Sequence, residues 1–330
     1  MKKHLFFATL LSSVGALSLV SCGGDEVKQA NNTFMCIKSF ENVMEQEMIV
    51  YENVYPNVLL GCQYVTENEA FKELMDGKTR LIVAGRDLTP EEKTRLESRK
   101  ETKNVRSMQI AVDAIALIVN PDNPVDTLTM GDVSRILRGE IKTWSQLQPG
   151  APETPIKVVV DNPESGIVSY MRNKVIDGGS FDPSVVVTAD SLSGVFNKVK
   201  SNKNYLGLTG SSWLTSDLAS VNKEELLEAL EQQKFDQREF NSRMSNSGVK
   251  TVALMHNSLE AYGPTQENIY SGDYPLTRPI YMITTASPVG NLGKFYSYVT
   301  GVNGQKIILK AGVMPARLHM QIYELTSPEF

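Results

Sequence analysis

Residues 34–84 read FMCIKSFENVMEQEMIVYENVYPNVLLGCQYVTENEAFKELMDGKTRLIVA, three short apolar runs separated by two amphipathic stretches. The apolar runs predict strands at 34–38, 58–65 and 80–84, and the stretches between them predict helices at 39–53 and 66–77. Thr66 followed by Glu69 is a helix-start signal, and Gly77 is a stop signal. Strands that alternate with helices in this way predict a parallel sheet covered on both faces.

Two further apolar strands flank the middle third of the chain. Residues 109–120 read QIAVDAIALIVN, and residues 274–283 read YPLTRPIYMI, whose prolines suit only an edge or a crossover strand. We therefore predict an α/β fold in which two lobes are joined by two crossover strands, with a ligand cleft between them. Lobe one is expected at 33–118 and 283–330, and lobe two at 119–282.

The N-terminus predicts export and a membrane anchor. Lys2 and Lys3 precede an apolar run of about 15 residues, which is short for a membrane span and typical of a signal peptide at 1–21. Residues 19–22 read LVSC and match a bacterial lipobox, so Cys22 is the predicted lipidation site. Residues 22–32 would then be a polar tether, and the alternative is an ordinary signal peptide with an incidental cysteine.

Composition narrows the possible functions of the exported part. Apolar residues make up 41% and charged residues 22%, as in ordinary globular proteins, and the net charge of −5 argues against a nucleic-acid binder. The remaining thiols are Cys36 and Cys62, which we expect to be free because a disulfide between neighbouring strands is strained. His256 and His319 are isolated in the sequence, so no metal site and no cofactor are predicted.

Five segments in order carry a resemblance to a known family. They are LIVAGRDLT at 81–89, DAIALIVNP at 113–121, ILRGEI at 136–141 with Trp144, YPLTRP at 274–279, and Gly304-Gln305 with Pro315. The chain resembles the phosphate-binding lipoproteins of ABC importers, in the type II periplasmic-binding-protein group. The resemblance implies a phosphate ligand, an ABC permease as partner, a monomer, and a place in the envelope of a Gram-negative bacterium, on the periplasmic side or at the outer membrane.

The resemblance also points to three strand-to-helix turns as the phosphate site. A desolvated oxyanion needs many hydrogen-bond donors, which helix N-termini supply. The candidate turns are Ser39-Phe40, Gly85-Arg86 and Ser165-Gly166-Ile167. The alternatives are that Ser39 is a plain helix cap and that Arg86 is a surface arginine.

Asp113 is the most informative candidate because it is an acid inside an apolar run. A carboxylate in an anion site can accept a hydrogen bond only from a protonated ligand, so Asp113 would favour phosphate over sulfate. The alternative is an aspartate that bonds its own backbone at a strand irregularity. We expect Arg278, in the return crossover, to brace the hinge rather than to bind the ligand.

The sequence departs from the family in the third turn. The family has Ser-Gly-Thr preceded four residues earlier by Arg, whereas this chain has Ile167 and Asp161 at those positions. A binder or sensor of another oxyanion, such as a phosphonate, a phosphoester or a sulfate-like ion, is therefore the alternative function. A phosphoester hydrolase is a minor alternative because no Gly-x-Ser-x-Gly elbow or phosphate-binding glycine loop occurs, and no enzyme activity is predicted.

Overall fold

The computed structural model describes residues 32–100, 102, 104–151, 153–215, 248–255 and 260–317. The predicted signal peptide and Cys22 lie outside this range, so their predictions are not tested by the structure. The principal elements in chain order are β1 (Thr33–Ile37), η1 (Lys38–Phe40), α2 (Glu41–Val54), β2 (Gly61–Val65), α3 (Glu67–Asp76), β3 (Leu81–Ala84), α4 (Pro90–Glu97), β4 (Arg106–Val119), β5 (Thr127–Thr129), α5 (Met130–Leu137), η2 (Trp144–Gln146), β6 (Lys157–Val160), α6 (Gly166–Val175), β7 (Val186–Thr188), α7 (Leu192–Ser201), β8 (Tyr205–Gly210), α8 (Ser212–Thr215), β9 (Lys250–Thr251), β10 (Ala253–Met255), α11 (Gln266–Ser271), β11 (Thr277–Thr284), α12 (Asn291–Val299), α13 (Val302–Lys310) and β12 (Met314–Pro315).

Ten of the described strands form one continuous sheet. Its main path runs β2-β1-β3-β11-β4-β8-β6-β7, while β9 and β12 pair with β4 off this path. The long strand β4 belongs to both halves, because its residues up to Ala114 pair with β11 and those from Ile115 onward pair with β8. We call the half on β2, β1, β3 and β11 lobe one, and the half on β8, β6 and β7 lobe two.

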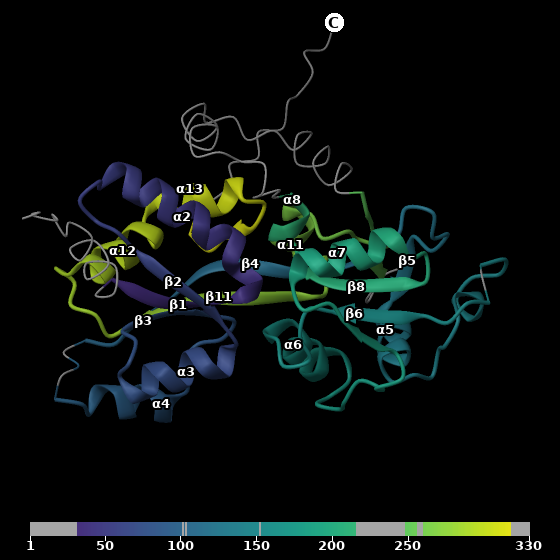
Figure 1. Cartoon of the computed structure of the whole chain (residues 1–330), viewed down its shortest axis with the longest axis horizontal. Coiled ribbons are helices and arrows are strands. Elements are labelled where there is room, and N and C mark those ends of the chain that lie inside the picture. The colour runs from purple at the N-terminus through teal and green to yellow at the C-terminus, as the bar shows by residue number, and fades with distance from the viewer. Residues whose placement is uncertain are drawn as a thin grey trace, which may run out of the picture.

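Helices cover both faces of the sheet in both lobes. In lobe one, α2, α12 and α13 lie on one face and α3 and α4 on the other, as Figure 1 shows. In lobe two, α7 lies on one face and α5 and α6 on the other (Figure 1). This arrangement confirms the predicted α/β fold of two lobes. The exact lobe boundaries at 118 and 283 stay a prediction.

Local signals in the sequence explain several helix starts. Thr89 and Glu92 form a reciprocal capping box at α4, with Pro90 at the first helical position. Ser165 caps α6 by accepting a hydrogen bond from the backbone N–H of Val168. The alternative reading of Ser39 as a helix cap is wrong, because Ser39 lies inside η1 and α2 has Phe40 at its N-cap without a side-chain bond.

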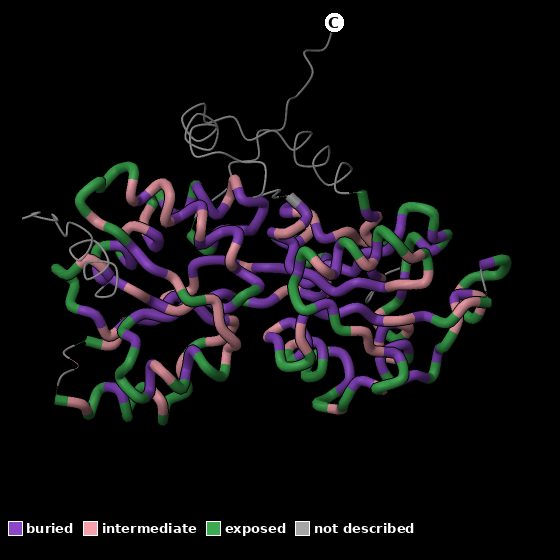
Figure 2. Tube along the Cα trace, viewed as in Figure 1, coloured by how far each residue is buried: buried purple, intermediate pink, exposed green. Residues whose placement is uncertain are grey.

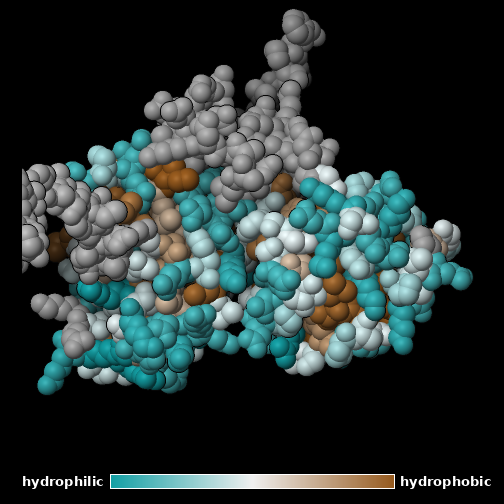
Figure 3. All heavy atoms as spheres, in the orientation of Figure 1, coloured by the Kyte–Doolittle hydropathy of each residue, from teal (hydrophilic) through white to brown (hydrophobic). Residues whose placement is uncertain are grey.

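Each lobe has its own apolar core on the sheet. The inner strands β3, β6 and β8 are buried along most of their length, whereas exposed residues gather on helices and loops, as Figure 2 shows. On the face drawn in Figure 3 the described surface is mainly hydrophilic, with smaller hydrophobic patches. Among the described residues, no helix has the length and apolar character needed to cross a bilayer.

Candidate functional site

A buried ion pair lies where the two crossover strands meet. Arg278 in β11 is paired in register with Asp113 in β4, so the two side chains are direct cross-strand neighbours. Nε and Nη2 of Arg278 donate to Oδ2 of Asp113 at 3.2 and 2.9 Å. The hydroxyl of Ser211 donates to the other carboxylate oxygen at 3.0 Å. Since Asp113 is fully buried and Arg278 is only 2% exposed, this ion pair lies in a low-dielectric setting.

Arg278 also connects this ion pair to the first predicted turn. Its Nη2 donates to the hydroxyl of Ser39 at 2.7 Å. The remaining nitrogen, Nη1, makes no hydrogen bond to a described residue, and it lies close to two glycines. A Cβ placed on Gly166 would be 3.5 Å from Nη1, and one placed on Gly85 would be 3.9 Å away. Arg278 therefore lies beside the turns of both lobes, and its Nη1 can still donate hydrogen bonds.

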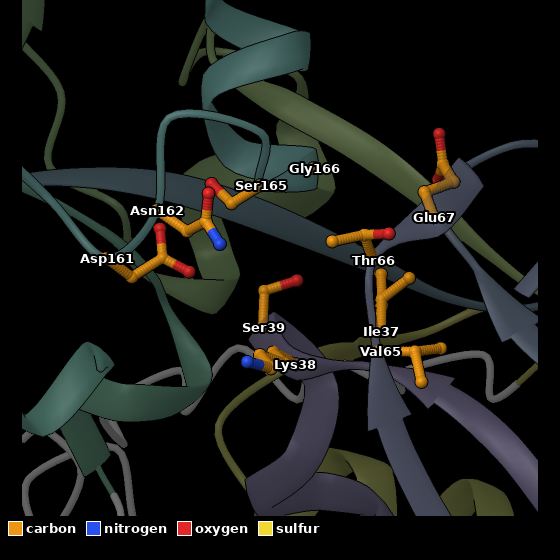
Figure 4. Close-up of a pocket in the computed structure, with 10 residues that line it drawn as sticks. All are labelled: Ile37, Lys38, Ser39, Val65, Thr66, Glu67, Asp161, Asn162, Ser165 and Gly166. Carbon is orange, nitrogen blue, oxygen red and sulfur yellow. The ribbon is translucent and has the colours of Figure 1, made fainter. Parts of the chain in front are cut away.

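A pocket lies beside these turns and is lined from both lobes (Figure 4). Lobe one contributes two stretches and lobe two contributes the loop that leads into α6. The lining residues are Ile37, Lys38, Ser39, Val65, Thr66, Glu67, Asp161, Asn162, Ser165 and Gly166. Gly166 and Ile167 are the first two residues of α6, so their backbone N–H groups have no partner within the helix and remain available to an anion at this end.

Two of the predicted site residues can act only through their backbone. Phe40 is fully buried in the core of lobe one, and Ile167 is fully buried in the core of lobe two. Their side chains therefore pack against apolar neighbours. Any contact with a ligand would come from the amide of Phe40 or Ile167.

Arg86 has partners of its own outside the pocket. Its Nη1 and Nη2 donate to the two carboxylate oxygens of Glu92 at 2.8 and 2.9 Å, and its guanidinium lies 3.5 Å from the ring centre of Phe71. These hydrogen bonds raise the pKa of Arg86 and lower the pKa of Glu92. In the same turn, the amide of Gly85 donates to Glu67 at 2.7 Å. Ser39, Ser165 and Gly166 line the pocket, whereas Asp113, Arg278 and Arg86 do not. Asp113 is joined to Ser39 through Arg278, while Arg86 is held by Glu92.

Arg278 is the principal residue that the sequence did not assign to the site. Its hydrogen bonds to Ser39 and Asp113 place it next to the pocket, and the expectation that it braces the hinge stays a prediction. The sequence held one signal, because Asp113 needed a buried partner and Arg278 is the basic residue in the other crossover strand.

Tyr170 adds a link between α6 and the return strand. Its hydroxyl donates to the carbonyl of Thr277 at 2.7 Å. Burial raises the pKa of Tyr170 to about 12, with the nearby charges of Arg278 and Asp113 acting in opposite directions. The phenol is therefore a neutral donor that fixes α6 against β11 at physiological pH.

The pocket combines hydrogen-bond donors that suit an anion with two acids, Glu67 and Asp161. Within the described ranges, no group of three His, Cys, Asp or Glu side chains could hold a metal ion. Cys36 and Cys62 are both free thiols, with Cys36 buried and Cys62 half-buried. The hydroxyls, the α6 amides and the guanidinium supply donors from several directions, which is what a desolvated oxyanion requires.

Comparison with known proteins gives consistent matches over most of the chain. The profile of the PBP superfamily domain matches residues 34–303. A protein of Pseudomonas aeruginosa named phosphate-binding protein PstS is 26% identical over 289 residues, which is 83% of this chain and 79% of that protein. A PstS of Staphylococcus saprophyticus is 26% identical over 65% of this chain and 57% of its own length.

Solved structures share the fold at lower sequence identity. A putative phosphate ABC transporter substrate-binding protein from Clostridium perfringens, with bound phosphate, gives a TM-score of 0.62 at 23% identity and covers 87% of this chain and all of its own. An ABC-type phosphate transport receptor from Vibrio cholerae gives a TM-score of 0.58 at 22% identity, over 86% of this chain and 98% of its own. These likenesses support the two-lobe fold.

Proposed function

Because this chain belongs to the family of PBP superfamily domains, we propose that it captures inorganic phosphate between its lobes and delivers it to an ABC importer. The observation that carries the proposal is the placement of Arg278, which is bound to Ser39 of lobe one and lies beside Gly166 of lobe two. The relatives named phosphate-binding protein PstS support the choice of ligand.

In the proposed complex, the phosphate lies at the N-terminus of α6. The amides of Gly166 and Ile167 and the hydroxyls of Ser165 and Ser39 donate to its oxygens. The free Nη1 of Arg278 adds a charge-assisted bond, which is stronger than a neutral one. Phe40 contributes its amide, and Asp113 acts by holding the guanidinium in place.

The remaining predictions about location belong to the same proposal. Lipidation of Cys22 would hold the protein at the membrane beside its permease. A monomer would be sufficient for binding because one chain lines the pocket. Residues 1–21 would be removed on export, and residues 22–32 would serve as the tether. Mass spectrometry of the membrane fraction would test the anchor through the lipid mass on Cys22.

A second candidate function is capture of a different oxyanion. The observation that favours it is Asp161, a carboxylate on the pocket wall where a further cation would suit phosphate. A phosphonate or a phosphoester presents fewer negative oxygens to this wall than inorganic phosphate does.

Calorimetry distinguishes these candidates. We expect one phosphate to bind per chain. We expect no heat of binding with sulfate, because sulfate has no proton to donate to a carboxylate in the site. Heat with sulfate and none with phosphate would overturn the proposal, while heat with methylphosphonate alone would favour the second candidate. If the protein hydrolysed a chromogenic phosphoester with saturable kinetics and Arg278→Met abolished this activity, the hydrolase alternative would be favoured.

A further inference from the structure

Asp161 is a buried carboxylate whose hydrogen bonds are incomplete. It follows β6 at the start of the loop into α6, and only 4% of the residue is exposed. Its buried Oδ1 has no hydrogen-bond partner, and no described residue forms an ion pair with it. A buried charge without a partner is strongly unfavourable. The position of Asp161 on the pocket wall indicates that its partner arrives through the pocket.

Among the described residues that line the pocket, Lys38 is the only basic one. Arg278 is already bound to Asp113, and Glu67 accepts the amide of Gly85. Lys38 lines the same pocket from the opposite lobe, is exposed, and has no ion pair with a described residue. In Figure 4 the carboxylate of Asp161 and the ammonium of Lys38 both lie on the side of the pocket away from Val65 and Thr66.

An ammonium group can serve a carboxylate and an oxyanion together. Lys carries three donors on a flexible stem, so one N–H can bond Asp161 while another bonds a ligand oxygen. The carboxylate would then restrict the ammonium to one position instead of leaving it free in solvent. An acid on the wall of an anion pocket can serve through such a partner as well as by accepting a hydrogen bond from a protonated ligand.

We propose that Lys38 is a ligand-contacting residue and that Asp161 is its positioning residue. When the two lobes close on the oxyanion, the ammonium of Lys38 bonds Asp161 across the cleft and the ligand beside it. The pair therefore couples closure to ligand binding. This inference rests on the proposed function only in that the ligand is an oxyanion.

A double-mutant cycle on phosphate affinity tests the pair, using Lys38→Met, Asp161→Asn and the double variant. Asp161→Asn alone removes a negative charge from an anion pocket, so simple electrostatics predicts tighter binding. We expect instead that it weakens phosphate binding about tenfold, because Lys38 loses its position. Lys38→Met should weaken binding by about tenfold or more.

The double variant shows whether the effect of Asp161→Asn on phosphate affinity depends on Lys38. Once Lys38 is Met, Asp161 only repels the anion, so adding Asp161→Asn should leave the affinity unchanged or raise it. Tighter binding with Asp161→Asn in both backgrounds, or additive effects of the two changes, would overturn the proposal. Urea unfolding of each variant without ligand serves as the control for folding.

Two further outcomes are distinguishable by choice of ligand. Asp161→Asn could weaken the binding of 2-aminoethylphosphonate but not that of methylphosphonate or phosphate. The partner of Asp161 would then be the ligand's ammonium, and the proposal would be wrong. If the wild-type chain bound no phosphate but did bind methylphosphonate, the proposed function would fail, and the same cycle run on methylphosphonate would still decide the role of Lys38. If the wild-type chain bound neither, both proposals would be overturned.

Discussion

Asp113 and Glu47 are both wholly buried acids, but they lie in opposite surroundings. Asp113, between the lobes in β4, accepts hydrogen bonds from Arg278 and Ser211. Glu47, on α2 in lobe one, has two carboxyl oxygens without a hydrogen-bond partner. Burial raises the pKa of Glu47 well above its usual value.

The difference shows how burial acts on a titratable group. Taking a carboxylate out of water is unfavourable, and a counter-charge with hydrogen bonds offsets that cost. Arg278 and Ser211 supply both to Asp113 at the interlobe centre. The described residues around Glu47 in lobe one supply neither, so burial favours its neutral form and raises its pKa.

The largest expected effect comes from removing the counter-charge of Asp113. Arg278→Met leaves a buried carboxylate unpaired, which should lower the free energy of unfolding by about 3–5 kcal/mol and abolish phosphate binding. Urea unfolding and calorimetry would measure the two effects. Arg278→Lys, which keeps the charge but not the forked geometry, should fold better and still bind phosphate weakly.

Arg86→Met is the matched control for this prediction. Its ion pair with Glu92 is partly exposed, with 41% of the arginine side chain accessible, so the loss should be about 0–1 kcal/mol. Phosphate binding should survive. Loss of binding with Arg86→Met and its retention with Arg278→Met would reverse the assignment of the ligand-binding arginine.

The fold could be predicted from the sequence because its signals are local. The alternation of strands and helices from 34 to 84, and the capping box of Thr89 and Glu92, depend on residues near one another in the chain. The role of Arg86 was hard to predict because its ion-pair partner, Glu92, also belongs to this capping box. Glu92 lies six residues from Arg86 in sequence and is close enough to bind it.

The site could be predicted only in part because its centre depends on strand register. Asp113 and Arg278 are 165 residues apart in sequence, and they meet because β4 and β11 pair with these residues opposite each other. Apolar periodicity predicts a strand but not which residue of its neighbour it faces. That Ser39, Ser165 and Gly166 lie beside one pocket was predictable because they follow strands at one edge of the sheet.

Glu47→Gln should stabilise the protein in a pH-dependent way. A raised pKa in the folded state means that Glu47 contributes most below its unfolded pKa and that this contribution falls as pH rises toward the folded pKa. Each pH unit in that interval amounts to about 1.4 kcal/mol, and Gln resembles the neutral acid at every pH. Urea unfolding at about pH 5 and about pH 8 should therefore show a larger gain for the variant at the higher pH.

The same substitution at an exposed acid is the control for Glu47→Gln. Glu97 lies on α4 at the surface, so Glu97→Gln should change the free energy of unfolding little at either pH. If wild type and Glu47→Gln had parallel pH profiles, Glu47 would be ionised in the folded protein. The contrast with Asp113 would then be wrong.

The smallest expected effect concerns the thiol of Cys36, a buried group that, like Glu47, has no counter-charge among the described residues. Burial raises the pKa of the Cys36 thiol well above its usual value, with a further contribution from its contact with Cys62. Since the thiolate is the reactive form, Cys36 should resist maleimide in the folded protein and react on unfolding. In a Cys62→Ala variant, mass spectrometry should show labelling of Cys36 at least about a hundredfold slower in buffer than in urea, because labelling requires a rare opening of the core. Equal labelling rates in the two conditions would show that the fold around β1 does not protect Cys36. The burial that raises the pKa of Glu47 in the same lobe would then have to be reconsidered.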